Sequence, residues 1–137
     1  MKRGGILHPQ LSRIITGLGH RDGLVIADAG LPIPLEVERV DLAFAPGKPP
    51  FMEVLEAVLG ELEVEAVILA QEIHSHTPIA FYQALTERLS KLPKVGQNLE
   101  YIPHQEFKAR LNQVKAVVRT GEFTPFANVI LLSGVVF

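Results

Sequence analysis

Apolar residues recur at helical spacing in several segments of the chain. From Leu11 to Leu18 they fall three or four residues apart, and Pro9 suits a first helical turn because its missing N–H needs no partner there. Gly17 or Gly19 can end this helix. The same spacing predicts further helices over residues 51–60, 78–92 and 104–112.

Short runs of β-branched and other apolar residues separate these helices. The run VEAVILA, residues 64–70, is almost wholly apolar, as is typical of a strand with both faces buried. Strands that alternate with helices favour an α/β fold. We therefore expect a single domain, residues 1–137, with a mainly parallel sheet flanked by helices in a three-layer, Rossmann-like arrangement. The other expected strands are residues 24–28, 38–44, 99–102, 115–120 and 128–137.

The end of the chain is strongly apolar. After Asn128, the only polar side chain is that of Ser133. A tail of this composition predicts burial, either inside the chain's own sheet or against another subunit.

The composition narrows the class of protein without indicating an activity. With 47% hydrophobic residues, 20% charged residues and a net charge of -2, the chain fits an ordinary soluble globular protein. It has no basic run to neutralise phosphates, so we expect neither nucleic acid nor a membrane as partner. The absence of cysteine excludes disulfides, thiolate metal sites and a cysteine nucleophile. The N-terminal segment lacks the apolar core of a signal peptide, so we expect a cytoplasmic protein.

Polar residues bracket the first expected strand. In GHRDGLVIADAGLPIP, residues 19–34, His20 precedes the strand and Asp28 follows it, ahead of a loop stiffened by prolines. Ligands of α/β sheets gather beyond the carboxyl ends of strands, which makes Asp28 a candidate site residue. The alternative is that Asp28 only forms a turn and that His20 only follows a helix end.

Further candidates lie at element ends in the second half of the chain. His104 is expected to begin a helix, and Lys108 lies four residues on, on the same helical face. Asn128 stands where a loop meets a strand, so its amide can serve the backbone or hold a sugar hydroxyl. His104 can likewise cap its helix or face water. Imidazole, carboxylate, amine and amide groups without a thiol or metal suit acid–base chemistry on a hydroxylated molecule.

Two sequence patterns resemble a nucleotide-binding motif and a metal site, but the neighbouring residues argue against both functions. The glycines from Gly17 to Gly23 have the wrong spacing for a dinucleotide fingerprint and precede a strand, whereas the fingerprint follows a strand and opens a helix. Glu72, His74 and His76 would share one face of a continuing strand, as a two-histidine, one-carboxylate metal site requires. Because Thr77-Pro78 indicates a helix entry, we favour a polar loop here and expect no metal ion.

The whole sequence resembles the ribose and fucose mutarotase family. The similarity runs from end to end, and the combination of LGH, DAGLPIP and PFAN is highly specific. DAGLPIP favours the ribose branch over the fucose branch. The segments that carry the resemblance are MKRGGILHPQLSRIITGLGH, LVIADAGLPIP, RVDLAF, FMEVLEAV, EAVILAQEI, HQEFK, AVVRTGE and PFANVILLSGVVF.

The resemblance implies a cofactor-free isomerase that interconverts the pyranose and furanose forms of free D-ribose. It implies that His20 is the proton donor and that Asp28 and His104 bind the sugar at the catalytic centre. Lys108 and the Phe126-Ala127-Asn128 segment are implied to lie at the sugar as well. The resemblance further implies a ring-shaped homopentamer or homodecamer with active sites between neighbouring subunits.

One position departs from the family pattern. Members typically carry Tyr-Ala-Asn where this chain has Phe126-Ala127-Asn128. The missing hydroxyl removes a hydrogen bond worth on the order of 1 kcal/mol, which would weaken binding or rate by about tenfold without abolishing activity. Two alternatives therefore stay open, namely a ring that binds sugar without catalysis and a mutarotase for another sugar such as fucose.

Opening a pyranose ring requires one proton at the ring oxygen and the removal of another from the anomeric hydroxyl. Histidine suits both tasks because its usual pKa of about 6.5 leaves both of its forms populated. We expect His20 to protonate the ring oxygen and His104 to act at the anomeric hydroxyl. Asp28, across the short strand, is expected to orient His20 or to hold a sugar hydroxyl, and Asn128 to position the sugar.

Overall fold

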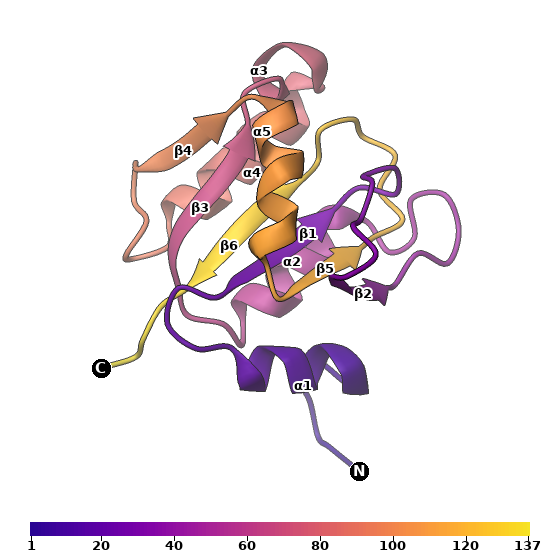
Figure 1. Cartoon of the computed structure of the whole chain (residues 1–137), viewed down its shortest axis with the longest axis vertical. Coiled ribbons are helices and arrows are strands. Elements are labelled where there is room, and N and C mark those ends of the chain that lie inside the picture. The colour runs from indigo at the N-terminus through magenta and orange to yellow at the C-terminus, as the bar shows by residue number, and fades with distance from the viewer.

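A six-stranded sheet forms the centre of the molecule in the computed structural model, which describes residues 1–137 (Figure 1). In spatial order its strands are β2 (Glu38–Asp41), β5 (Ala116–Arg119), β1 (Gly23–Ala27), β6 (Val129–Ser133), β3 (Val64–Ala70) and β4 (Leu99–Ile102). The helices are α1 (Pro9–Gly17), α2 (Phe51–Leu59), α3 (Ile73–His76), α4 (Ile79–Ser90) and α5 (His104–Arg110), and a 3₁₀ turn at Leu111–Gln113 follows α5. None of these helices has the length and apolar composition needed to cross a membrane.

The directions of the strands decide which segments meet at each edge of the sheet. β1 and β2 run parallel to β5, and β3 runs parallel to β4, whereas β6 runs antiparallel to β1 and β3. Five of the six strands point the same way, so the expected mainly parallel sheet is confirmed, except that the last strand, β6, runs antiparallel. The reason is that residues 120–128 form no helix and are fewer than the dozen or so residues that a parallel crossover needs. Consequently β6 begins at the edge where the other strands end.

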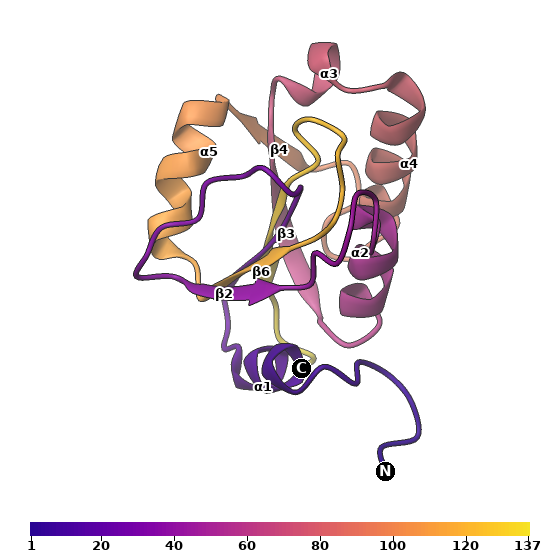
Figure 2. The ribbon, with the colours of Figure 1, turned by 90° about the vertical axis from the view of Figure 1, so that its right-hand side faces the viewer.

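Helices cover both faces of this sheet, as the three-layer expectation requires. Figure 2 shows α5 on one face and α2 and α4 on the other, with α1 below one end of the sheet. α1 begins as the sequence predicts, since Pro9 opens it and the His8 Nδ1 accepts the Leu11 N–H at 3.3 Å.

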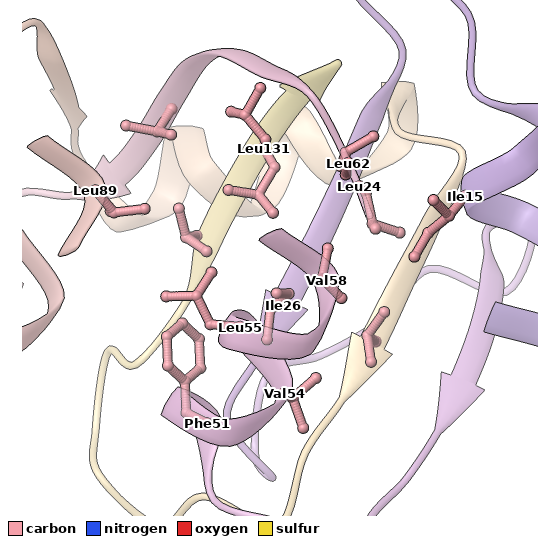
Figure 3. Close-up of a cluster of buried hydrophobic side chains, with 14 of the residues drawn as sticks. Ile15, Leu24, Ile26, Phe51, Val54, Leu55, Val58, Leu62, Leu89 and Leu131 are labelled. Atoms are coloured by element: carbon pink, nitrogen blue, oxygen red, sulfur yellow. The ribbon is translucent and has the colours of Figure 1, made fainter. Parts of the chain in front are cut away.

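The core follows from the alternation of side chains along the strands. All of β1 is buried, and Leu24 and Ile26 point to the face covered by α2. Figure 3 shows Ile26 beside Leu55 and Val58 of α2, with Leu24 in the same cluster next to Leu62. Val25 and Ala27 point the other way, into a second cluster that contains Phe107 of α5. Because β1 is packed on both faces, it is a rigid support for the residues at its two ends.

Most element boundaries lie within two residues of the expected ones, and three larger differences stand out. The second strand ends at Asp41 rather than continuing to residue 44. The segment expected to be a polar loop contains the short helix α3. The last strand stops at Ser133, and Val136 and Phe137 are 85% and 99% exposed. Within one chain the apolar tail is buried along β6, while its last residues leave the sheet, and their burial against another subunit stays a prediction.

Candidate functional site

A cavity of about 550 Å³ opens at the edge where five strands end and β6 begins. Its volume lies in the usual range for a small-molecule pocket. The loop of residues 120–128, drawn in orange to yellow, lies at this edge (Figure 1). The lining consists of residues 28–32, His104, Arg119, residues 122–126 and Asn128. The candidates Asp28, His104, Phe126 and Asn128, far apart in the sequence, thus meet in one cavity.

Asp28 follows the last residue of β1, and Asn128 precedes the first residue of β6. The Asn128 Oδ1 accepts the Asp28 backbone N–H at 2.9 Å, and the Asn128 Nδ2 donates to the Asp28 Oδ2 at 3.0 Å. The Gly30 N–H donates to the Asp28 Oδ1 at 2.9 Å. Asp28 therefore forms the turn that the simpler alternative predicts and lines the cavity as well. A carboxylate has about four acceptor sites, so the Asp28 side chain retains acceptor capacity for a ligand hydroxyl.

Burial raises the pKa of the Asp28 carboxyl above its usual value. The hydrogen bonds from Gly30 and Asn128 oppose this rise because they favour the charged form, and so does the nearby His104. Asp28 is thus a half-buried carboxyl group whose charged form is stabilised by a few hydrogen-bond donors.

His104 is the first residue of α5 and lines the cavity together with Asp28. Both oxygens of the Glu72 carboxylate accept its backbone N–H, at 3.1 and 2.9 Å. The first N–H groups of a helix have no acceptor within the helix, and the Glu72 carboxylate supplies one for the N–H of His104. Burial lowers the pKa of the His104 imidazole, and the charge of Lys108 lowers it further, while Glu72 and Asp28 oppose the shift.

The ring of His104 has one polar atom without a partner. Its Nδ1 is buried and makes no hydrogen bond. The ring stands edge-to-face to Phe126, with centroids 5.0 Å apart and planes at 87°, and stacks beside Phe107 at 6.3 Å. A buried polar atom left unpaired costs about 1–3 kcal/mol. This nitrogen is itself shielded from solvent, so it is a cost to the fold rather than a contact point for a ligand.

Phe126 adopts a backbone conformation that is rare for a bulky residue. Its φ is +61°, in the left-handed region, and its carbonyl accepts the Asn128 N–H at 2.8 Å. Neighbouring groups hold this turn, since the Thr77 hydroxyl donates to the Pro125 carbonyl at 2.8 Å. Strained residues of this kind cluster at functional sites. Here the turn places an aromatic ring against His104.

Lys108 and Ala127 do not line the cavity, in contrast to the other candidates near them. Lys108 lies one turn after His104 in α5, where its charge acts on the imidazole. The side chain of Ala127 is fully buried in the hydrophobic core.

His20 lies at the other edge of the sheet, before β1. Its Nε2 is 2.9 Å from the Glu65 Oε2, and its side chain is 55% exposed. The five residues of β1 rise about 3.3 Å each and separate the two edges by about 16 Å. Within one chain, His20 and Asp28 cannot contact the same sugar. The expectation that Asp28 orients His20 is therefore wrong for a single chain, in which Glu65 is the partner of His20.

The sequence interpretation did not select two charged residues that line the cavity. Arg119 ends β5, donates to the Ala29 carbonyl at 3.0 Å and pairs with Asp41 at 3.0 Å. The Glu122 Oε1 accepts the N–H of Phe51, the first residue of α2, at 3.3 Å. The available signal was their position at or just beyond the end of an expected strand, since ligands gather at the carboxyl ends of strands.

Glu72, His74 and His76 do not share one face. They lie in and before the helix α3, so the strand geometry that a metal site needed is absent. The ring of His74 packs against Tyr101 at 4.4 Å, while His76 meets Phe126 at 5.6 Å. The structure contains no group of three histidine or acidic side chains suited to a metal ion.

Comparison with known proteins assigns the whole chain to one family. The RbsD / FucU transport protein family matches residues 1–136, and the chain belongs to this family. The D-ribose pyranase of Geobacillus kaustophilus is 49% identical over 137 residues, which cover 100% of this chain and 96% of that protein. The D-ribose pyranase of Actinobacillus pleuropneumoniae is 54% identical over 140 residues, covering both proteins completely. The resemblance drawn from the sequence is thus confirmed.

Solved structures agree with this assignment. Bacillus subtilis RbsD in complex with D-ribose matches with a TM-score of 0.86 and 44% identity, over 100% of both chains. The fucose mutarotase of Streptococcus pneumoniae matches over 100% of both chains with a TM-score of 0.80 but only 22% identity, which shows a shared fold.

Proposed function

We propose that this protein is an isomerase that interconverts the pyranose and furanose forms of free D-ribose. The main support is that Asp28, His104 and Asn128 meet in one cavity of a chain that is 49% and 54% identical to two D-ribose pyranases. Opening and closing a hemiacetal transfers protons and no electrons. Acid and base groups of the chain therefore suffice, without a cofactor or a metal ion.

Asp28 holds a sugar hydroxyl in this proposal. Its carboxylate is fixed by Asn128 and by Gly30, and it retains acceptor capacity for a hydroxyl. Asn128 is only 1% exposed, so its part is to position Asp28 more than to cover the sugar. The aromatic face of Phe126 packs against the sugar ring beside His104.

His104 is the partner group at the anomeric hydroxyl. Burial and Lys108 keep its pKa below the usual value, so the neutral imidazole prevails near pH 7 and has a nitrogen free to take a proton. The position of His104 in the lining of the same cavity as Asp28 supports this assignment. When the other ring closes, the proton returns to the new anomeric oxygen.

His20 of a neighbouring subunit donates the proton to the ring oxygen. The distance along β1 rules out a contribution from the same chain, and the exposed position of His20 leaves it accessible to another copy. Head-to-tail contacts of this kind generate closed rings when the rotation between subunits closes, as a homopentamer or homodecamer requires. The expected cytoplasmic location stays a prediction.

The experiment that tests this function is NMR magnetisation exchange on free D-ribose, with and without protein, in the presence of a chelator. We expect faster exchange between the pyranose and furanose signals, and loss of that acceleration in His104→Ala. A panel of sugars that includes L-fucose tests the preference for ribose. Ribose binding without faster exchange would contradict the proposal and favour a non-catalytic binding ring.

A further inference from the structure

Glu65, the second residue of β3, lies far from the cavity and contacts the proposed proton donor. Its Oε2 is 2.9 Å from the Nε2 of His20. Its other oxygen, Oε1, accepts the Arg21 Nη1–H at 3.0 Å. The Glu65 side chain is only 20% exposed, so the carboxylate is a fixed partner rather than a freely moving one.

The groups around His20 leave Glu65 as its only charged contact. Arg21 follows His20 in the chain, and its guanidinium is bound to the same carboxylate. Asp22 is engaged by the Gly19 N–H at 2.9 Å and by Lys115 at 3.6 Å. The hydrogen bond from Arg21 holds the pKa of the Glu65 carboxyl below its usual value, so this group is an anion throughout the neutral range.

A carboxylate has no proton to donate, so the contact with His20 requires a proton on Nε2 of the imidazole. The other ring nitrogen, Nδ1, then remains for the reaction. A carboxylate that fixes the tautomer and direction of a catalytic imidazole is a known arrangement in enzymes that use histidine as acid and base.

We propose that Glu65 is the positioning residue of His20, which it holds by the Nε2–H so that Nδ1 exchanges the proton with the sugar in the neighbouring subunit. This inference rests on the proposed function and extends it to a residue outside the cavity. The imidazolium of His20 gives its Nδ1 proton to the ring oxygen as the bond from the anomeric carbon to that oxygen breaks. The anomeric hydroxyl loses its proton to His104, and an aldehyde and a hydroxyl result. Closure by another hydroxyl reverses both transfers, so protons balance over the cycle.

The test combines kinetics with nitrogen-15 NMR of histidine-labelled protein, in which His20→Ala assigns the His20 signals. In the wild type we expect the neutral His20 ring to carry its proton on Nε2. Glu65→Ala should yield a mixture of tautomers and lower kcat for ribose exchange by about 10²-fold, the lower end of what one positioned general acid contributes. KM should change little, since Glu65 does not line the cavity. Glu65→Asp keeps the charge with a shorter reach and should fall between the two.

Glu63→Ala is the matched control. Glu63 lies two residues before Glu65 and pairs with Lys94 at 3.4 Å, so the substitution removes a carboxylate of the same kind from the same edge. We expect wild-type kcat and an unchanged His20 tautomer in this variant.

Two results would overturn the inference about Glu65 while leaving the proposed function intact. One is an active wild type whose His20 carries its proton on Nδ1, and this measurement needs no variant. The other is a Glu65→Ala protein with wild-type kcat. A wild type that does not accelerate ribose exchange would overturn the proposed function as well.

Discussion

Asn128 binds Asp28 through both ends of its side-chain amide, although the two residues are 100 positions apart in the sequence. The oxygen accepts the backbone N–H at 2.9 Å, and the nitrogen donates to the carboxylate at 3.0 Å. This pair joins the end of β1 to the start of β6 and determines how the carboxylate faces the cavity.

Asn128→Ala should lower both stability and activity. The substitution leaves the Asp28 N–H without its acceptor in a largely buried place, at a cost of about 1–3 kcal/mol in the free energy of unfolding. Loss of the Nδ2–H donor also raises the pKa of Asp28 further, since this hydrogen bond favours the charged form. Urea unfolding and ribose exchange measure the two effects. An Asn128→Ala protein as stable as the wild type would show that the pair contributes little.

Mixed oligomers test whether the site is shared between subunits. His20→Ala and His104→Ala should each be inactive as pure proteins. If His20 acts in the neighbouring subunit, co-expression of the two variants yields some sites with both histidines, and part of the activity returns. A mixture of two His104→Ala preparations with different tags is the control. Mixed oligomers without activity would contradict the assignment of His20 to a neighbour.

Lys108→Met should move the acid limb of the pH–rate profile to higher pH. Burial is the first cause of the lowered His104 pKa and the charge of Lys108 the second, so removing this charge lets the pKa rise. His104 then becomes protonated, and loses its ability to act as a base, at a higher pH than in the wild type. The profile of kcat/KM against pH measures the shift, because it reports the free enzyme.

Lys91→Met is the control for that experiment. Lys91 is an exposed residue at the end of α4 that pairs with Glu87 at 3.2 Å. Its replacement by methionine changes the net charge by the same amount as Lys108→Met. Its acid limb should coincide with that of the wild type. Equal shifts in the two variants would point to net charge as the cause.

The stability of the folded chain should also depend on His104. Because its pKa is lowered on folding, the unfolded chain binds more protons than the folded one at pH values below about 6.5. The contribution of His104 therefore makes the free energy of unfolding fall as the pH decreases through this window. His104→Gln should reduce the slope between neutral and mildly acidic pH in urea unfolding. An unchanged slope would show that the imidazole is not held neutral.

Phe126→Tyr should improve catalysis or binding of ribose. The new hydroxyl restores a hydrogen bond worth on the order of 1 kcal/mol, so kcat/KM should rise by about tenfold or less. Phe126→Gly relaxes the left-handed backbone, φ +61°, and removes the ring. We expect a more relaxed turn with weaker ribose binding in the glycine variant. If Phe126→Tyr lowered kcat/KM, the cavity of this chain would differ from that of its relatives at this position.

Much of the fold could be predicted from short stretches of sequence. The β-branched run at residues 64–70 forms β3, and the apolar spacing from Leu11 to Leu18 forms α1. These features depend on neighbours a few positions away, which the sequence displays directly. The candidates Asp28, His104 and Asn128 were selected for the same reason, since each stands where an element begins or ends.

Contacts between distant segments could not be predicted in this way. The direction of β6 depends on the shortness of the loop before it and on pairing with β1 and β3. That direction places Asn128 at the edge where Asp28 lies. It also brings Arg119 and Glu122 to the cavity, while His20 lies at the opposite edge.

The sequence by itself determined the class of fold, the positions of its helices and strands, and the chemical types of the groups available for catalysis. Only the tertiary structure decided which of those groups meet. It joined Asp28 to Asn128, separated His20 from both by the length of β1, and gave His20 the carboxylate of Glu65. The physical reason is that helices and strands follow from local spacing, whereas a site depends on the order and direction in which strands pair across the whole sheet.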